Sequence, residues 1–185
     1  MSPAFPIFTE RFIMRSVLLL SFCTFFIINA QSQSLKKYDI AQSGCSVYMY
    51  CAPGRFTESF SEDSSKVYNA ECNINDLTCG IVCVKLLTPS ENLGEAEDMV
   101  ISYLDYLKVN FDIKSSAGYG RGNHLNNRED TRGVTDYWKD GNNNNWKVKA
   151  WTNGKIIGVL YAYSQKELPE TKIDVFLNSF RFPGM

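Results

Sequence analysis

Apolar and polar side chains alternate along the first part of the chain with the period of two that is typical of β-strands. Every second side chain between residues 45 and 51 is apolar, and Pro53-Gly54 ends this segment. Two further strands, rich in β-forming residues, are predicted at 67–74 and 77–87, with Asn75-Asp76 as the tight turn between them. The pattern therefore predicts an antiparallel opening of three strands.

The pattern then changes to a helical period. Thr88 as N-cap, Pro89 in the first helical position and Glu91 three residues after the cap form a capping box. The apolar residues that follow form one stripe that is expected to face a core: Ala96, Val100, Tyr103, Leu104, Leu107 and Phe111. The charged residues of this segment are expected to face water: Glu97, Asp98, Asp105 and Lys108.

Further strands and a closing helix are predicted in the second half. The strands are expected at 113–117, 134–138, 146–151 and 156–163, with a glycine-containing loop or broken hairpin between the first two. Asn153-Gly154 is a strong hairpin signal, because both residues tolerate positive φ. As a two-residue turn it pairs Trp151 with Ile156 and Trp146 with Tyr161, and Pro169 begins the closing helix. These elements predict an α+β fold, an antiparallel sheet with helices packed on it.

Residues 14–30 have the layout of a signal peptide. A cationic start at Arg15 precedes an apolar run of 12 residues from Val17 to Ile28, and small and polar residues follow. The run is shorter than the ~20 residues of a membrane-spanning helix. We therefore expect cleavage after Ala30 and no stable membrane span once the signal is removed.

Two alternatives stay open in this region. Met14 would open the signal better than Met1, in which case residues 1–13 are an upstream extension. Cys23 follows a segment that resembles a bacterial lipobox at two positions. However, the bulky Phe22 before it and the apolar residues after it favour removal with the signal over lipidation.

The composition is that of one soluble globular domain. The chain of 185 residues is 44% hydrophobic and 21% charged, which excludes collagen-like, low-complexity and multi-span membrane classes. The formal net charge is −1 and no block of like charges is present, so nucleic-acid binding is not expected. We expect a flexible leader at 31–44, a single globular domain at 45–185, and export to the periplasm or out of the cell.

Cysteines remain in odd number after the signal: Cys45, Cys51, Cys72, Cys79 and Cys83. In an exported protein, this leaves at least one thiol unpaired or paired with another chain. The turn at Asn75-Asp76 places Cys72 directly opposite Cys79, at a separation that a disulfide tolerates. Cys72–Cys79 is therefore the candidate disulfide. The alternative is that all of these cysteines are small buried hydrophobic residues.

Three short motifs support a family resemblance. Tyr50-Cys51-Ala52-Pro53-Gly54 opens the domain, residues 146–155 form the late hairpin, and residues 176–182 form an aromatic end. With the order of elements, residues 45–183 resemble PsbP-like domains. The resemblance implies an α/β/α sandwich around an antiparallel sheet, in a group whose members mostly bind proteins or lipids. It implies no shared set of site residues and no metal.

Catalytic and metal-binding patterns are weak in this sequence. His124 is the only histidine and has no nucleophile motif nearby, so a solvated loop residue is expected. The cysteine spacings fit neither a zinc site nor a Cys-x-x-Cys motif. Asp140, Asn142 and Asn144 alternate as in a calcium loop, but the glycine and glutamate of an EF-hand are missing. We predict no catalytic residues, no metal and no cofactor.

The candidate binding residues are four aromatic or basic side chains. Tyr119 and Arg121 are expected to anchor a mobile contact loop, and Trp138 and Trp151 complete the predicted ligand- or partner-binding set. The signal and the domain layout favour a non-catalytic exported module that binds a protein or a cell-envelope component. A carrier of a small apolar or lipid ligand, held between the sheet and a helix, is the alternative. An enzyme of unknown reaction is a second alternative.

Overall fold

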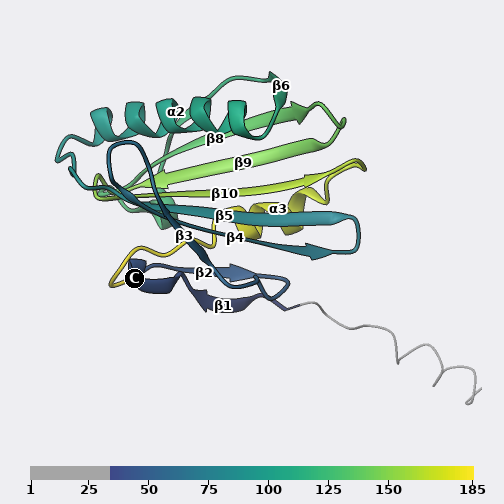
Figure 1. Cartoon of the computed structure of the whole chain (residues 1–185), viewed down its shortest axis with the longest axis horizontal. Coiled ribbons are helices and arrows are strands. Elements are labelled where there is room, and N and C mark those ends of the chain that lie inside the picture. Colours follow the sequence, from purple (N-terminus) through teal and green to yellow (C-terminus); the bar gives the residue numbers. More distant parts are fainter. Residues whose placement is uncertain (1–33) are drawn as a thin grey trace, which may run out of the picture. The chain divides into compact units, whose positions relative to one another are not determined.

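An antiparallel sheet of eight strands forms the centre of the fold (Figure 1). The order of neighbours is β3-β4-β5-β10-β9-β8-β6, and β7 also pairs with β8. The strands are β3 Thr57–Phe60, β4 Lys66–Ile74, β5 Leu77–Lys85, β6 Ile113–Ser116, β7 Gly120–Asn123, β8 Arg132–Asp140, β9 Asn145–Thr152 and β10 Ile156–Ser164. Consecutive long strands are joined by tight turns, so the sheet is built largely from hairpins.

The computed structural model describes residues 34–185, and the folded unit spans Leu35–Met185. The predictions of a signal peptide at 14–30, of a start at Met1 or Met14, and of the fate of Cys23 lie outside the described residues.

Helices and a small hairpin pack on the two faces of the sheet. Helix α2 (Leu93–Asn110) contacts β8 and β9 on one face. On the other face, α3 (Glu170–Leu177) contacts β9 and β10, and β1 (Lys36–Asp39) and β2 (Ser46–Met49) pair as a separate hairpin. The predicted α+β class is confirmed at this level. In the described part of the chain, no helix combines the length and the apolar character that a membrane crossing requires.

The central strands contribute to a separate core on each face, because successive side chains of a strand point to opposite sides. On β10, Val159 and Tyr161 lie in the core beside α2, whereas Leu160 and Ala162 lie in the core beside α3. The central strands β5 and β10 are therefore largely apolar on both faces, whereas every residue of the edge strand β3 is exposed.

Regular structure begins earlier than predicted. The expected flexible leader at 31–44 contains β1 and a short helical turn, η1 (Ala41–Ser43), and Ile40 between them is fully buried. Lys36 of β1 pairs with Met49 of β2. A strand of four mostly exposed residues shows no apolar alternation, so the local sequence pattern could not predict its pairing with β2.

The predicted disulfide has the right strand register but the wrong partner. Cys72 lies opposite Cys79 in the β4–β5 hairpin, yet the disulfide joins Cys72 to Cys51, with Cα atoms 5.8 Å apart. Cys45, Cys79 and Cys83 are free and buried, and burial raises the pKa of the Cys79 thiol to about 12. The loop after β2 brings Cys51 against β4. The sequence of the β4–β5 hairpin does not indicate this contact.

The β9–β10 hairpin is present, but its register is shifted by two residues. Thr152 pairs with Ile157, so the turn contains four residues instead of the two that Asn153-Gly154 predicts. Asn153 Oδ1 accepts hydrogen bonds from the backbone N–H groups of Lys155 and Ile156, which holds this longer turn. A shift of two residues keeps every side chain on its predicted face.

Helix α2 begins later than the predicted capping box. Its N-cap is Asn92, whose Oδ1 accepts from the backbone N–H groups of Gly94 and Glu95. The predicted N-cap, Thr88, stays outside the helix, because the Ser90 N–H donates to a carbonyl of the β9–β10 turn at 2.8 Å. The apolar stripe is confirmed by four fully or largely buried residues: Ala96, Val100, Leu104 and Leu107.

Candidate functional site

One helix cannot cover a whole face of this sheet. A helix with its side chains is about 10 Å wide and strands lie about 4.8 Å apart, so α2 covers roughly two strands, β8 and β9. The part of this face that is farthest from β8, toward the outer side of β4 and the exposed edge strand β3, is less covered. A groove of about 540 Å³ lies here, and we call it the α2–β3 groove. Residues that line it include Arg55, Ser59, Glu71, Val82, Tyr103 and Tyr161.

The floor of the groove comes from three neighbouring strands. Glu71 of β4 pairs with Gly80 of β5, which pairs with Tyr161 of β10. A Cβ at Gly80 would overlap the Tyr161 ring, so the glycine leaves the space that this ring occupies. The Tyr161 hydroxyl donates to Glu71 Oε1 at 2.7 Å. Burial, with the nearby Glu71 carboxylate, raises the pKa of Tyr161, so its hydroxyl remains a donor at neutral pH.

Aromatic packing fixes the end of the groove near the C-terminus of α2. The Phe111 ring centroid lies 5.2 Å from the centroids of Tyr161 and Trp146, and Trp146 stacks on Tyr163 at 4.1 Å. Trp146 Nε1 also donates to Asp140 Oδ2 at 2.9 Å. This chain of contacts holds Phe111 and Tyr161, both of which line the groove.

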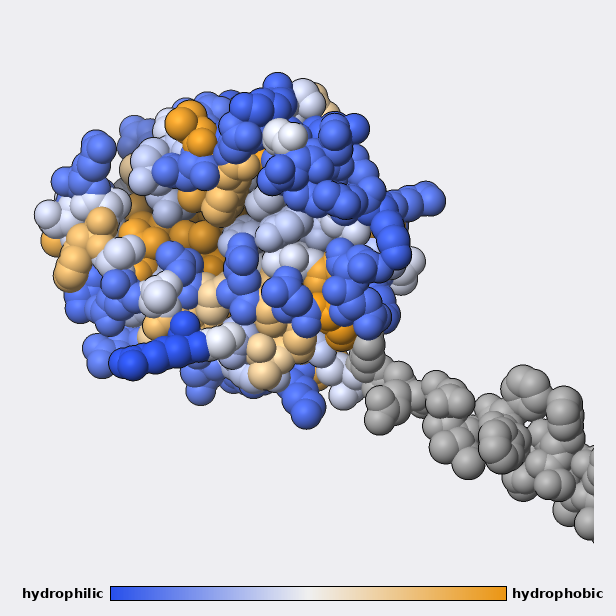
Figure 2. Space-filling view, turned by 45° about the vertical axis from the view of Figure 1, so that its right-hand side comes forward, coloured by the Kyte–Doolittle hydropathy of each residue, from blue (hydrophilic) through white to orange (hydrophobic). Residues whose placement is uncertain are grey.

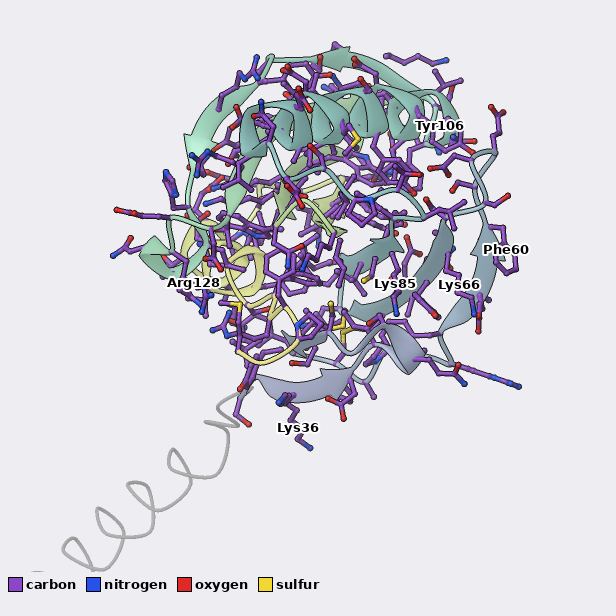
Figure 3. The ribbon with its side chains drawn as sticks, turned by 90° about the vertical axis from the view of Figure 1, so that its left-hand side faces the viewer. Lys36, Phe60, Lys66, Lys85, Tyr106 and Arg128 are labelled. Atoms are coloured by element: carbon purple, nitrogen blue, oxygen red, sulfur yellow. A yellow bond between two sulfur atoms is a disulfide. The ribbon has the colours of Figure 1, made fainter. Side chains whose placement is uncertain are left out.

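Exposed aromatic side chains lie on the two rims. Tyr106 on α2 and Phe60 on β3 are 56% and 65% exposed and are seen on the same side of the molecule in Figure 3. Tyr103 lies half-buried beside Tyr106, and burial raises its pKa to about 12. The Tyr103 hydroxyl has no hydrogen-bond partner within residues 34–185, so it is available to donate to a ligand. Figure 2 shows apolar surface in a recess between hydrophilic side chains.

Two opposite charges line the groove. Arg55 lies in the loop before β3, and the N–H of the preceding Gly54 donates to the Glu71 carbonyl at 3.4 Å, so this loop follows β4. Within the described residues, neither the Arg55 nor the Glu71 side chain forms an ion pair. Glu71 uses one oxygen for Tyr161. The other oxygen and the guanidinium are free to bind.

The groove provides apolar contacts and hydrogen-bonding groups, and neither His124 nor Asp140 lines it. His124, which the sequence places in a solvated loop, lies after β7 with Nδ1 3.0 Å from the Arg128 carbonyl oxygen, and it does not line the groove. In residues 34–185, no group of three or more His, Cys, Asp or Glu side chains could hold a metal ion. The Asp140 carboxylate, considered as a calcium ligand, accepts instead from the N–H groups of Asn142 and Asn144.

The predicted contact residues Tyr119 and Arg121 are held against α2. Lys108 Nζ donates to the Tyr119 hydroxyl at 2.7 Å, and Arg121 Nε donates to Glu97 Oε2 at 3.1 Å. Glu97 also accepts from the Gly122 N–H, and it is buried, although its helical position predicts exposure to water. A second recess, also of about 540 Å³, lies beside Tyr119 and Arg121. The loop predicted to be mobile is therefore anchored to the helix by several polar contacts.

The other two predicted binding residues are core residues. Trp138 and Trp151 are 3% and 1% exposed. The indole N–H of Trp138 donates to Asp136 Oδ2 at 2.6 Å, and that of Trp151 donates to the Leu177 carbonyl at 2.8 Å. Neither offers exposed surface or a free indole N–H to a partner, so the structure adds no support to their predicted binding role. The sequence shows that a strand carries aromatic side chains, but it does not show how deeply other elements bury them.

Sequence reasoning missed the residues of the α2–β3 groove. Gly80, inside an otherwise apolar strand, was the available signal, because such a glycine often marks the close approach of another group. Comparison of the chain with protein-family models and with curated proteins gives no match. The groove is therefore the feature that points to a candidate function.

Proposed function

We propose that this protein is a non-catalytic, exported binding module and that the α2–β3 groove is its binding site. The observation that carries the proposal is an open groove of about 540 Å³ with an apolar floor and unpaired polar groups. Ligand sites commonly have volumes of about 300–1,000 Å³ and combine an apolar lining with a few polar groups. The exposed Tyr106 and Phe60 add contact area for a partner on the rims.

Export to the periplasm or out of the cell belongs to the same proposal. The signal-like layout of residues 14–30 supports it, and the Cys51–Cys72 disulfide suits an oxidising compartment. The PsbP-like layout over residues 45–183 adds support for a binding role, because members of that group mostly bind proteins or lipids. The partner we propose is a protein or cell-envelope component that inserts a group into the groove.

A carrier of a small apolar or lipid ligand is the second candidate. The apolar floor favours it, since Val67, Val82 and Leu107 line the groove between the sheet and α2. Native mass spectra of the exported protein after mild extraction separate the two candidates. A copurified lipid that leaves on extraction with organic solvent supports the carrier, and a bare protein supports the module that binds a partner.

Occupancy of the groove is tested by NMR titration with a library of small fragments, using the full chain expressed with its own export sequence and purified after export. We expect fragments to shift the backbone signals of β3, β4 and the C-terminal half of α2. Ser59→Trp places a large side chain at the groove and should abolish these shifts. Glu58→Trp, on the same exposed strand but not lining the groove, should preserve them.

Two outcomes would overturn this proposal. One is a set of shifts confined to the recess at Tyr119 and Arg121. The other is equal binding by the two tryptophan variants, which would show that the fragments do not occupy the groove.

A further inference from the structure

We infer that the α2–β3 groove selects a small zwitterionic molecule that carries an apolar or aromatic side group, such as a free hydrophobic α-amino acid. The inference rests on the proposed role of the α2–β3 groove as a binding site, and it takes the bound group to be a small molecule of this chemical class. It comes from the juxtaposition of two opposite, unpaired charges with an apolar floor in one groove.

The two charges lie near one another at one end of the groove. Arg55 and Glu71 both line the groove. The Gly54 N–H donates to the Glu71 carbonyl at 3.4 Å, one residue out of the β3–β4 register, so the backbone next to Arg55 lies directly against Glu71. The two side chains nevertheless form no ion pair with each other.

Each charge keeps capacity for a ligand. Tyr161 occupies Glu71 Oε1 and leaves Oε2 to accept from an ammonium group. The Arg55 guanidinium has five N–H donors in a planar fork that matches a carboxylate. The Tyr103 hydroxyl, protonated and unpartnered within residues 34–185, adds a neutral donor. A ligand with both an ammonium and a carboxylate can pair with both charges, whereas a ligand with one charge can pair with only one of them.

The rest of the groove defines the side group. Val67, Val82 and Leu107 provide apolar surface, and the Phe111 and Tyr161 rings lie at its end. Burial of an apolar or aromatic side group against this surface supplies most of the binding free energy. The exposed charges contribute less, because water and salt screen them. The charges then provide selectivity among ligands with the same side group.

Four probes with the same ring test the inference on the exported full chain by NMR titration or calorimetry. L-Phenylalanine carries both charges, phenethylamine only the positive one, 3-phenylpropanoate only the negative one, and N-acetyl-L-phenylalanine amide neither. We expect L-phenylalanine to bind about tenfold more tightly than either singly charged probe, the difference that one charge-assisted hydrogen bond gives. This comparison needs no variant, so it is independent of any folding defect.

Two substitutions assign the charges. Glu71→Gln should weaken L-phenylalanine and phenethylamine by about tenfold and leave 3-phenylpropanoate unchanged. Arg55→Gln should weaken L-phenylalanine and 3-phenylpropanoate and leave phenethylamine unchanged. Glu58→Gln and Lys66→Gln remove an exposed ion pair close to the groove and should change none of these affinities.

Three results would overturn the inference. Equal affinity for all four probes would leave the binding function intact but exclude charge selection. Tighter binding of short-chain phosphatidylethanolamine than of L-phenylalanine would assign the groove to a lipid headgroup. The third result is that no probe binds and that, without ligand, the effects of Arg55→Gln and Glu71→Gln on the free energy of unfolding are coupled. It would show that the two charges pair with each other. A failure of the whole fragment library would instead remove the proposed function.

Discussion

Asp136 is a fully buried carboxylate whose partners lie inside the protein. Lys108 Nζ of α2 lies 3.1 Å from its Oδ2, Trp138 Nε1 donates to the same oxygen, and the Tyr137 N–H donates to Oδ1 at 2.8 Å. Burial lowers the pKa of Lys108, but its hydrogen bonds with Tyr119 and Asp136 outweigh burial and leave the pKa above its usual value. The charged amine therefore ties α2 to the sheet.

Removing one partner of this pair should be costly. We expect Asp136→Ala to lower the free energy of unfolding by about 3–5 kcal/mol, because it leaves the largely buried Lys108 charge with the exposed Asp105 as its remaining ionic partner. Asp105→Ala is the matched control, since Asp105 also contacts Lys108, at 3.4 Å, but its side chain is 61% exposed. Its loss should stay within about 1 kcal/mol. Urea denaturation measures both, and equal losses would contradict this assignment.

Asp140 should contribute to acid sensitivity. Burial raises the pKa of Asp140, but hydrogen bonds from Asn144 and Trp146 outweigh burial and hold the pKa below its usual value. A lowered folded-state pKa stabilises the fold above the unfolded value of about 3.9, and this contribution is lost as the pH falls through the folded-state pKa. Between about pH 5 and pH 2, the Tm of Asp140→Asn should therefore fall less than that of the native protein.

Thermal denaturation at several pH values tests this dependence. Glu167→Gln removes an exposed carboxylate and should keep the native slope of Tm against pH. If the slopes of Tm against pH are equal for Asp140→Asn and the native protein, Asp140 does not contribute to the acid sensitivity of the fold.

At the scale of elements, local signals compete with tertiary contacts. Thr88 to Glu91 has the sequence of a capping box, yet this segment is tied to the β9–β10 turn and α2 begins only at Leu93. The segment makes a contact that a longer helix would remove. Asn92 then takes the N-cap position, because its short side-chain amide can accept from the first free N–H groups of the helix.

The position of the cap can be measured. Asn92→Ala should lower the free energy of unfolding by about 1 kcal/mol, the usual contribution of an N-cap side chain. Thr88→Ala should change it by less than about 0.5 kcal/mol, because Thr88 is exposed and outside the helix. A larger loss of unfolding free energy for Thr88→Ala than for Asn92→Ala, measured by urea denaturation, would instead support the predicted capping box.

Gly80 provides a test of the groove floor. Gly80→Ala should lower the free energy of unfolding by about 1–3 kcal/mol, because the new methyl group overlaps the Tyr161 ring. Displacement of this ring should also weaken binding in the groove, since it breaks the hydrogen bond to Glu71. Gly54→Ala has open space around the new Cβ and should change stability by less than about 0.5 kcal/mol. A stable Gly80→Ala variant with unchanged binding would contradict this description.

At the scale of the whole molecule, elements from both ends of the chain cover the sheet face opposite α2. Lys147 of β9 forms ion pairs with Glu170 and, at 2.9 Å, with Asp174, both on α3. The β1–β2 hairpin reaches the same core, and the Cys51–Cys72 disulfide joins the loop after β2 to β4. This face therefore depends on contacts between distant segments.

Loss of the disulfide should weaken the whole fold. Cys51→Ser combined with Cys72→Ser should lower the free energy of unfolding by about 3 kcal/mol, as the chain-entropy model gives for a loop of this length. Peptide mapping without reduction should recover Cys51 linked to Cys72 in the native protein. Cys79→Ala should retain that link, and a peptide that joins Cys72 to Cys79 would contradict the structure.

The sequence was sufficient wherever burial follows a local period. The stripe of α2, the long strands and the turn at Asn75, with φ of 54°, were all predictable, because each depends on residues close in the chain. The edge strands β1 and β3 were missed, because four-residue strands with mostly exposed side chains show no alternation. The burial of Trp138 and Trp151 was not predictable, because it depends on which elements pack over their strands.

By itself, the sequence determined the α+β class, the order of the long elements and the face on which each central side chain lies, since apolar side chains must leave water at the spacing of a strand or a helix. Tertiary structure alone decided the disulfide partner, the start of α2 and the groove. Arg55, Glu71 and Tyr161 come from three separate segments. They meet because α2 is too narrow to cover the sheet, and this is a property of the assembled layers and of no single segment.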